Sequence, residues 1–150
     1  MFEIKEKLYR HCLKYIEDRI STAENAIISA QEASKDDTKS SAGDKYETTR
    51  EMMQQEISRN QVQLLEAKKL HHALLQISPE NTSKTIQAGS LIYTSNGNFY
   101  FAISAGQVRI ENELFFAIAP TSPIGFKFKG RTAGNVVAFN GREFLIKAIY

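Results

Sequence analysis

The fold is decided by a polar stretch in the first half of the chain, Ser34-Lys35-Asp36-Asp37-Thr38-Lys39-Ser40-Ser41-Ala42-Gly43-Asp44. These residue types favour turns and helix caps over helix interiors. Before this stretch, apolar or small residues recur at alternating steps of four and three, the spacing of a heptad seam, at Tyr9, Leu13, Ile16, Ile20, Ala23, Ile27 and Ala30. After it, the same rhythm returns, with Asn60 and His71 as polar interruptions, at Met53, Ile57, Leu64, Ala67 and Leu74.

The two seams mirror each other about a single turn near Ala42. Folding the chain there pairs Ile27 with Ile57 and Ile20 with Leu64. Two matching seams are better explained by an antiparallel helical hairpin, a coiled coil, than by two unrelated helices. An arm of about 35 residues would be roughly 50 Å long. A parallel dimeric coiled coil is the rival interpretation, but neither helix carries a leucine-rich seam, and a self-satisfied hairpin favours a monomer.

The composition of the chain changes near Ile77-Ser78-Pro79. Before this point there is no proline and a single glycine, Gly43, whereas all three prolines and the other seven glycines follow it. Because proline and glycine break helices, the first half is predicted to be helical and the second mainly strand. The predicted division is a hairpin over residues 1–78 with its tip near 38–47, a linker over 79–84 and a β-rich domain over 85–150.

Two Asn-Gly pairs, Asn96-Gly97 and Asn140-Gly141, lie between runs of β-branched and aromatic residues. This is the strongest short hairpin signal, because a type I′ turn needs a positive φ at both central residues. Residues 107–110 and 114–118 supply two more strands, and a short helix is expected within 121–130, starting after Pro123. The sequence therefore predicts an α+β protein in which an antiparallel helical hairpin precedes a small antiparallel β-domain.

Composition excludes several classes of protein. Hydrophobic residues make up 42% and charged residues 24%, which argues against a wholly disordered chain. No stretch approaches the roughly 18 uncharged apolar residues of a membrane span. Early charges at Glu3 and Lys5 argue against a secretory signal peptide, and the single Cys12 fits a reducing compartment, so a cytoplasmic location is expected. The net charge of +2 argues against a strong nucleic-acid-binding surface.

The familiar signatures of metal, nucleophile and nucleotide sites are absent from the sequence. His71 and His72 are adjacent, so they diverge on a helix instead of converging as ligands. Cys12 lies beside His11 on a predicted helix and is expected to be a half-buried thiol. The turn Ser104-Ala105-Gly106 matches neither nucleotide-binding fingerprint.

Acidic residues gather at the hairpin tip, with Asp36 and Asp37 before the turn and Asp44, Glu47 and Glu51 after it. One interpretation is structural: Asp44 is the N-cap of the second helix and Glu47 its capping-box partner. The other is functional: carboxylates at the end of a long rod reach into a deep channel and ligate Mg²⁺, which binds one or two carboxylates. The residues alone leave both open.

Two motifs resemble those of one family. Ala42-Gly43-Asp44-Lys45-Tyr46-Glu47 stands where the bacterial Gre-type transcript-cleavage factors carry a Gly-Asp-x-x-Glu tip between two long helices. Ile118-Ala119-Pro120-Thr121-Ser122-Pro123-Ile124-Gly125, followed by residues 129–135, is similar to that family's Ser-Pro-(Leu/Ile)-Gly segment and the turn after it. The order of the parts matches over nearly the whole chain, and the resemblance implies an FKBP-like β-domain.

The resemblance implies that the hairpin enters the secondary channel of RNA polymerase while the β-domain grips the channel rim. Asp44 and Glu47 would help to hold a Mg²⁺ shared with the polymerase and to orient a water that attacks the RNA near the 3′ end of a backtracked transcript. The polymerase would own the active site, so the chain would be neither an enzyme nor the holder of a cofactor of its own. The residues expected to contact the polymerase or its RNA are Tyr46, Ser122, Pro123, Gly125 and Lys129.

The sequence also departs from that family. Its members usually follow the tip glutamate with an asparagine and another acidic residue, whereas Thr48, Thr49 and Arg50 follow here. A regulator that occupies the channel without cleaving is therefore the second interpretation. A third, of a different class, is a coiled-coil adaptor or chaperone-like module with no polymerase partner, in which Asp44 and Glu47 only cap a helix.

Overall fold

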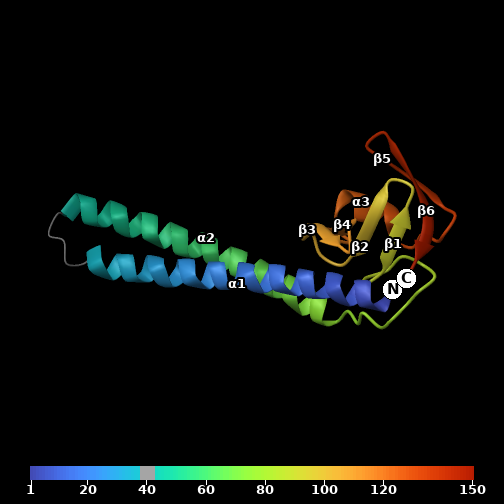
Figure 1. Ribbon diagram of the computed structural model, residues 1–150. Helices are drawn as coiled ribbons and strands as arrows, with labels where there is room; N and C mark the ends of the chain where they lie inside the picture. Colours follow the sequence, from blue (N-terminus) through green and yellow to red (C-terminus); the bar gives the residue numbers. More distant parts are fainter. Residues whose placement is uncertain (38–42) are drawn as a thin grey trace. The chain divides into compact units, whose positions relative to one another are not determined.

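A computed structural model of the chain describes residues 1–37 and 43–150, with side chains for 1–35 and 47–150 (Figure 1). The predicted α+β class is confirmed: two long helices precede a six-stranded sheet. The elements are α1 (Phe2–Asp37), α2 (Gly43–Leu75), β1 (Leu91–Thr94), β2 (Gly97–Phe101), β3 (Gly106–Ile110), β4 (Glu113–Ile118), α3 (Pro123–Phe128), β5 (Val136–Phe139) and β6 (Arg142–Ile149).

The two long helices reach further into the polar stretch than the sequence indicates. Residues 34–37 continue α1, and α2 already begins at Gly43, so the turn is shorter than the predicted one. The predicted centre of the turn, Ala42, lies outside the described residues. Packing explains the extension of α1: Ala30 is buried and Ala33 and Ser34 are half-buried, so seam contacts outweigh the turn preference of the residues that follow.

The chain forms two compact units, Ile16–His71 and Met1–Tyr15 with His72–Tyr150. The start of α1 and the end of α2 therefore belong to the same compact unit as the sheet. The sequence predicts a different division, with a hairpin over 1–78, a linker over 79–84 and a β-rich domain over 85–150. Those predicted domain bounds stay a prediction.

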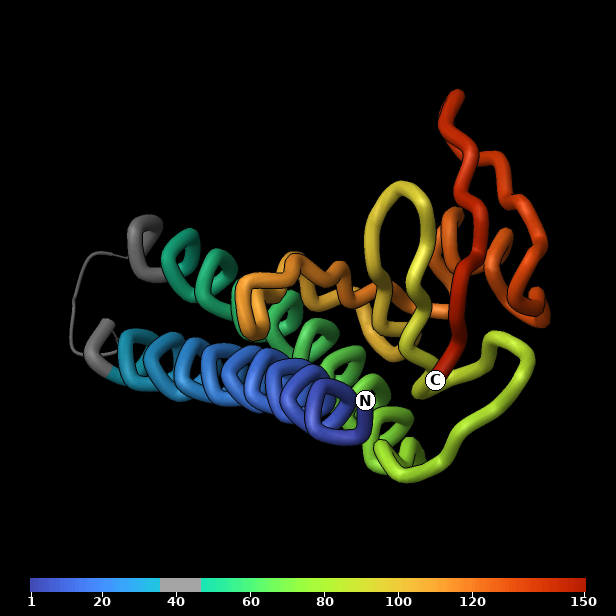
Figure 2. Tube along the Cα trace, turned by 45° about the vertical axis from the view of Figure 1, so that its right-hand side comes forward, coloured from blue at the N-terminus to red at the C-terminus, as the bar shows by residue number. Residues whose placement is uncertain are grey.

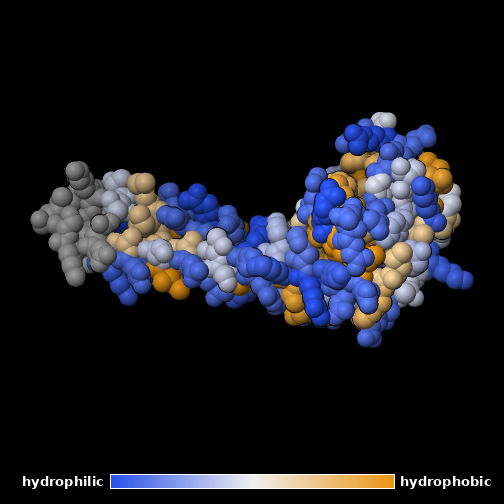
Figure 3. All heavy atoms as spheres, viewed as in Figure 1, coloured by the Kyte–Doolittle hydropathy of each residue, from blue (hydrophilic) through white to orange (hydrophobic). Residues whose placement is uncertain are grey.

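In the first unit, α1 and α2 run side by side as an antiparallel pair (Figure 2). The predicted seam faces inward: Ala23, Ala30, Ile57 and Ala67 are buried, and Ile20, Ile27, Met53 and Leu64 are half-buried. Exposed apolar side chains are scattered along the helices, and Figure 3 shows them as separate spots on a largely hydrophilic surface. Such isolated residues are normal on a soluble surface and do not mark a site. No described helix is long and apolar enough to cross a membrane.

The sheet of the second unit has the strand order β3-β4-β2-β1-β6-β5. All pairs are antiparallel except β2 with β4, which is parallel, so the predicted antiparallel β-domain is confirmed apart from this one pair. The reason is topological. Residues 102–105 lead the chain from β2 to the sheet edge, and the hairpin of β3 and β4 then returns β4 beside β2 in the same direction, the kind of crossover that a parallel pair requires.

The two Asn-Gly pairs form different turns. Asn140 and Gly141 have φ of 49° and 74°, so the predicted type I′ geometry between β5 and β6 is confirmed. Between β1 and β2, Ser95 and Asn96 form the turn, and Gly97, with φ 125°, already begins β2; the predicted type I′ turn is wrong there. The hydroxyl of Thr94 explains this, because it accepts from Asn96 N at 3.1 Å and donates to Gly97 O at 2.6 Å.

The core of this unit is aromatic. Phe99 packs against Phe116, Phe128 and Phe144, with ring centroids 5.7, 5.2 and 5.8 Å apart. Phe128 and Phe144 also meet edge to face at 5.8 Å. Because these rings come from β2, β4, α3 and β6, their cluster fixes the short helix and its flanking turns against the sheet.

Candidate functional site

The acidic tip segment lies at the start of α2. Asp44 and Glu47 are the second and fifth residues of that helix. Residues three positions apart in a helix share one face, so the backbone places these two positions on the same face. Glu47 is exposed, whereas the side chains of Asp44 and Tyr46 lie outside the described ones. The helix geometry therefore provides the spacing that a shared metal ligand pair needs.

The capping interpretation of Asp44 is not matched by the backbone. An N-cap residue stands before the first helical residue and has a non-helical conformation, whereas Asp44 follows Gly43 within α2. Two acidic residues in the first turns of a helix are still favoured by the helix macrodipole. Helix-end electrostatics thus favours acidic residues here whether or not they bind a metal.

Among the residues whose side chains are described, no group of three or more His, Cys, Asp or Glu is arranged to hold a metal ion. The sequence predicts that Asp44 and Glu47 share Mg²⁺ with a partner, and two carboxylates are a donor set that suits such sharing.

The Ser122-Pro123-Ile124-Gly125 segment builds the start of α3. Ser122 is the N-cap: its Oγ accepts from Gly125 N at 3.1 Å and donates to Ala119 O at 2.7 Å. Pro123 occupies the first helical position, where a missing N–H costs nothing. Gly125 is buried, and a Cβ there would lie 2.1 Å from Ala119 O. Contacts within the chain therefore explain why a serine stands at 122 and a glycine at 125, although both residues are predicted to contact a partner.

Among the predicted partner-binding residues whose side chains are described, the two exposed ones lie at opposite ends of α3. Pro123 is exposed at its start, and Lys129 is exposed at its end, where Lys129 N donates to Gly125 O at 3.0 Å. Phe126, between them, is 73% exposed. Contact of these residues with a partner stays a prediction.

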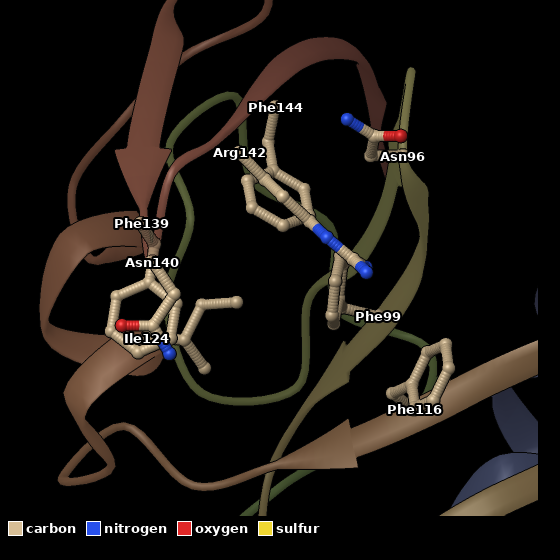
Figure 4. Close-up of a pocket in the computed structure, with 8 residues that line it drawn as sticks. All are labelled: Asn96, Phe99, Phe116, Ile124, Phe139, Asn140, Arg142 and Phe144. Atoms are coloured by element: carbon tan, nitrogen blue, oxygen red, sulfur yellow. The ribbon is translucent and has the colours of Figure 1, made fainter.

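A pocket of about 430 Å³ opens beside α3 (Figure 4). Its lining residues come from α3, from the β1–β2 and β5–β6 turns and from strands β2, β4, β5 and β6: Asn96, Phe99, Phe116, Ile124, Phe139, Asn140, Arg142 and Phe144. In the close-up the Arg142 side chain extends across the pocket, between Ile124 and Asn140 on one side and Phe99 and Phe116 on the other. Sequence reasoning missed this site, because its residues are spread over four separate stretches of the chain, 96–99, 116, 124 and 139–144.

A second feature that the sequence analysis missed is a buried polar group at the start of α1. Lys5, Leu8 and Cys12 are buried on one face of that helix, separate from the heptad seam. Lys5 Nζ donates to Asn81 O at 2.6 Å, which ties α1 to the predicted linker segment. Burial lowers the pKa of Lys5. The spacing of Lys5, Leu8 and Cys12, three and then four residues, was the available signal.

Cys12 is fully buried, and burial raises the pKa of its thiol from 9.0 to about 12, with a smaller opposing effect from a backbone hydrogen bond to Ile103. The thiolate, which is the reactive form, is therefore suppressed, and the thiol is more deeply buried than the half-buried one that the sequence predicts. Tyr100 lies in the same region with its hydroxyl buried, and burial likewise raises its pKa. Neither group is placed for nucleophilic chemistry.

This burial predicts a loss of stability at alkaline pH. Above pH 9.0 the unfolded chain releases the Cys12 proton while the folded chain keeps it, so the free energy of unfolding falls as the pH rises towards 12. One such group accounts for a slope of up to about 1.4 kcal/mol per pH unit. In Cys12→Ala, the free energy of unfolding should fall less steeply above pH 9, by up to this slope. Below pH 9 its pH dependence should match that of the wild type.

Urea denaturation of both proteins at a series of pH values, followed by the methyl NMR signals of the unit that contains Cys12 and the sheet, measures the effect on that unit, and the comparison cancels the contribution of Lys5. Parallel stability curves for the wild type and Cys12→Ala between pH 9 and 11 would contradict the burial of a neutral thiol.

The described chain thus defines a class by its fold: an α+β protein in which a long antiparallel helical hairpin precedes a small six-stranded mixed sheet. No protein-family model matches the sequence, and no curated protein matches it. Among solved structures, that of the transcription factor Gfh1 is similar, with 17% sequence identity, 92% of each chain covered and a TM-score of 0.36. A likeness this distant carries no argument about activity.

Proposed function

We propose that this chain is a transcription factor that binds RNA polymerase and stimulates the polymerase's own cleavage of backtracked RNA. The observation that carries the proposal is the position of Asp44 and Glu47, three residues apart in the first turns of α2 and next to the connection between two helices of 36 and 33 residues. Each helix is about 50 Å long, long enough to deliver its end into a deep channel.

In this proposal the hairpin tip enters the secondary channel of the polymerase. Asp44 and Glu47 supply two carboxylates on one helix face, and the polymerase supplies the remaining ligands. The Mg²⁺ shared between them provides Lewis-acid activation of water and charge stabilisation at the phosphate. The chain's own part is to position these carboxylates and to orient the attacking water. Tyr46, between the two acids, packs against RNA or the channel wall.

The β-domain has a separate task in the proposal, which is to hold the rim of the channel. Pro123 and Lys129 are exposed at the two ends of α3 and present an apolar ring and a cation to the partner. Ser122 and Gly125 act indirectly, because their contacts with Ala119 set the start of the helix that carries both residues. The protein is expected to work as a monomer in the cytoplasm.

A second candidate function is regulation by occupancy of the channel, without cleavage. Thr48, Thr49 and Arg50 favour it, because they follow Glu47 where the resembled family carries further polar and acidic residues. Arg50 also brings a cation within one turn of Glu47, where it would compete with a metal for that carboxylate.

RNA cleavage in a stalled, backtracked elongation complex tests the proposal. Asp44→Asn and Glu47→Gln should each lower the Mg²⁺-dependent cleavage rate about 100-fold or more, while binding to the polymerase persists. Glu51→Gln is the matched control, since it removes an exposed acid one turn further along α2 and should leave the rate within about twofold of the wild type.

The outcomes separate the candidates. Binding without cleavage by the wild type would contradict the cleavage role and favour the occupancy regulator. Failure of the wild type to bind the polymerase would contradict both and leave the coiled-coil adaptor.

A further inference from the structure

The pocket beside α3 has the make-up of a small-molecule site. Its volume of about 430 Å³ lies within the range of roughly 300–1,000 Å³ that ligand pockets occupy. Four phenylalanines and Ile124 supply most of its wall, and a few polar groups stand among them. Such a combination of an apolar wall and a few polar groups binds small molecules with a defined orientation.

The apolar wall is held rigidly. Phe99 and Phe144 are buried and pack on Phe128 behind them, at 5.2 and 5.8 Å between ring centroids. Phe116 and Phe139 are half-buried and present part of their rings to the pocket. A ligand entering here meets aromatic surface that is already ordered, so little conformational entropy is lost when an apolar group enters.

Arg142 gives the pocket its charge. It is the charged member of the lining set, and the described part of the chain places no carboxylate within salt-bridge distance of its guanidinium. The type I′ turn at Asn140 and Gly141 fixes the strand that carries it, and Figure 4 shows the side chain lying over the pocket. An arginine fork pairs with a carboxylate through two parallel hydrogen bonds.

The amides at the pocket rim add polar groups without adding charge. Asn96 Nδ2 donates to Glu143 O at 2.7 Å, which holds this amide against the start of β6. Asn140 lies opposite it, beside Ile124. With one cation and two amides, the rim suits a single carboxylate better than a phosphate dianion, which usually needs several cations or backbone N–H groups.

We infer that this pocket binds a small carboxylic acid that carries an aromatic or branched apolar group. The apolar group lies against Phe99, Phe116 and Phe139, and the carboxylate pairs with Arg142. The site is independent of the proposed polymerase function, because it uses none of the hairpin tip residues and requires no partner protein.

Titration of the full-length, isotope-labelled protein with 3-phenylpropanoate, followed by amide NMR shifts, tests the inference. We expect saturable shifts at Ile124, Asn140 and Arg142, with a dissociation constant in the millimolar range for so small a probe. The neutral 3-phenylpropanamide has the same shape and should bind at least about tenfold more weakly, because it cannot form the charged pair.

Arg142→Gln keeps a long polar side chain and removes the charge, and it should weaken binding of the acid about tenfold while leaving binding of the amide unchanged. Arg59→Gln, at an exposed position of α2 that does not line the pocket, is the matched control and should bind like the wild type. The dispersion of the spectra verifies that each variant is folded.

Three results would overturn the inference: equal affinity for the acid and the amide, equal affinity of the wild type and Arg142→Gln for the acid, or no saturable shifts at the pocket residues.

Discussion

Replacing Phe128 with alanine should destabilise the β-domain by about 3–5 kcal/mol, the usual range when a large aromatic side chain is removed from a core. Phe128 is the last residue of α3 and is 0% exposed. Its ring packs against those of Phe99 and Phe144, so its loss removes ring contacts from both sides of the core and leaves a cavity. Native-state hydrogen exchange of the β2 and β6 amides measures the effect on this unit alone.

The matched control lies two residues earlier on the same helix. Phe126 is 73% exposed, so Phe126→Ala should change the local stability by no more than about 0.5 kcal/mol. Phe128→Leu keeps most of the volume and should cost less than about 1.5 kcal/mol. Similar losses for Phe126→Ala and Phe128→Ala would mean that α3 does not dock as described.

Local hydrogen exchange is needed because the chain has two compact units. Urea unfolding of the whole chain combines the long hairpin with the β-domain, so a single transition is not assured. The amide signals of β2 and β6 report the opening of the sheet that Phe128 packs against.

The helical hairpin was predictable because its signal is local and periodic. A heptad seam specifies both the helix and the face that it buries, and Ala23, Ala30 and Ile57 are buried as the seam requires. The Asn140-Gly141 turn was predictable for a similar reason, since two adjacent residues determine its backbone. Neither prediction needs knowledge of residues distant in the sequence.

The sheet order and the pocket were not predictable in this way. The parallel pairing of β2 with β4 depends on where the chain places the hairpin of β3 and β4 after it leaves β2, which no local pattern encodes. The β3–β4 turn has positive φ at Glu111 and Asn112, residues that carry no glycine signal. Arg142 gains its role only when Phe99 and Phe116, from two other strands, are brought opposite it.

The candidate acidic site was predictable only in part. Helical spacing places Asp44 and Glu47 on one face, but whether they bind a metal depends on ligands from a partner, which the chain's own residues do not specify. For the Ser122-Pro123-Ile124-Gly125 segment, the structure supplies a role that the sequence did not predict. Its resemblance to a family motif suggested partner contact, whereas the structure gives Ser122 and Gly125 a direct role in starting α3.

Substituting Gly125 with alanine should destabilise the β-domain by about 3 kcal/mol, near the upper end for overpacking a buried site. Helix propensity alone predicts the opposite sign, since alanine is about 1 kcal/mol better than glycine inside a helix. The contact geometry outweighs it, because an alanine Cβ would lie 2.1 Å from Ala119 O and 2.8 Å from Ser122 Oγ. Both atoms belong to the cap that starts α3, so relieving the clash would break the Ser122 hydrogen bonds.

Gly141→Ala separates this clash from the general cost of replacing a glycine. A Cβ at Gly141 meets nothing within 4 Å, but its φ of 74° strains an alanine by about 1–2 kcal/mol. Hydrogen exchange of the β-domain amides should therefore show a larger loss of stability for Gly125→Ala than for Gly141→Ala, although only Gly141 of these two glycines has a positive φ. A stabilising Gly125→Ala would show that α3 can move away from Ala119. In that case the segment would not be fixed by its own contacts, and the shape of the pocket beside α3 would depend on what binds there.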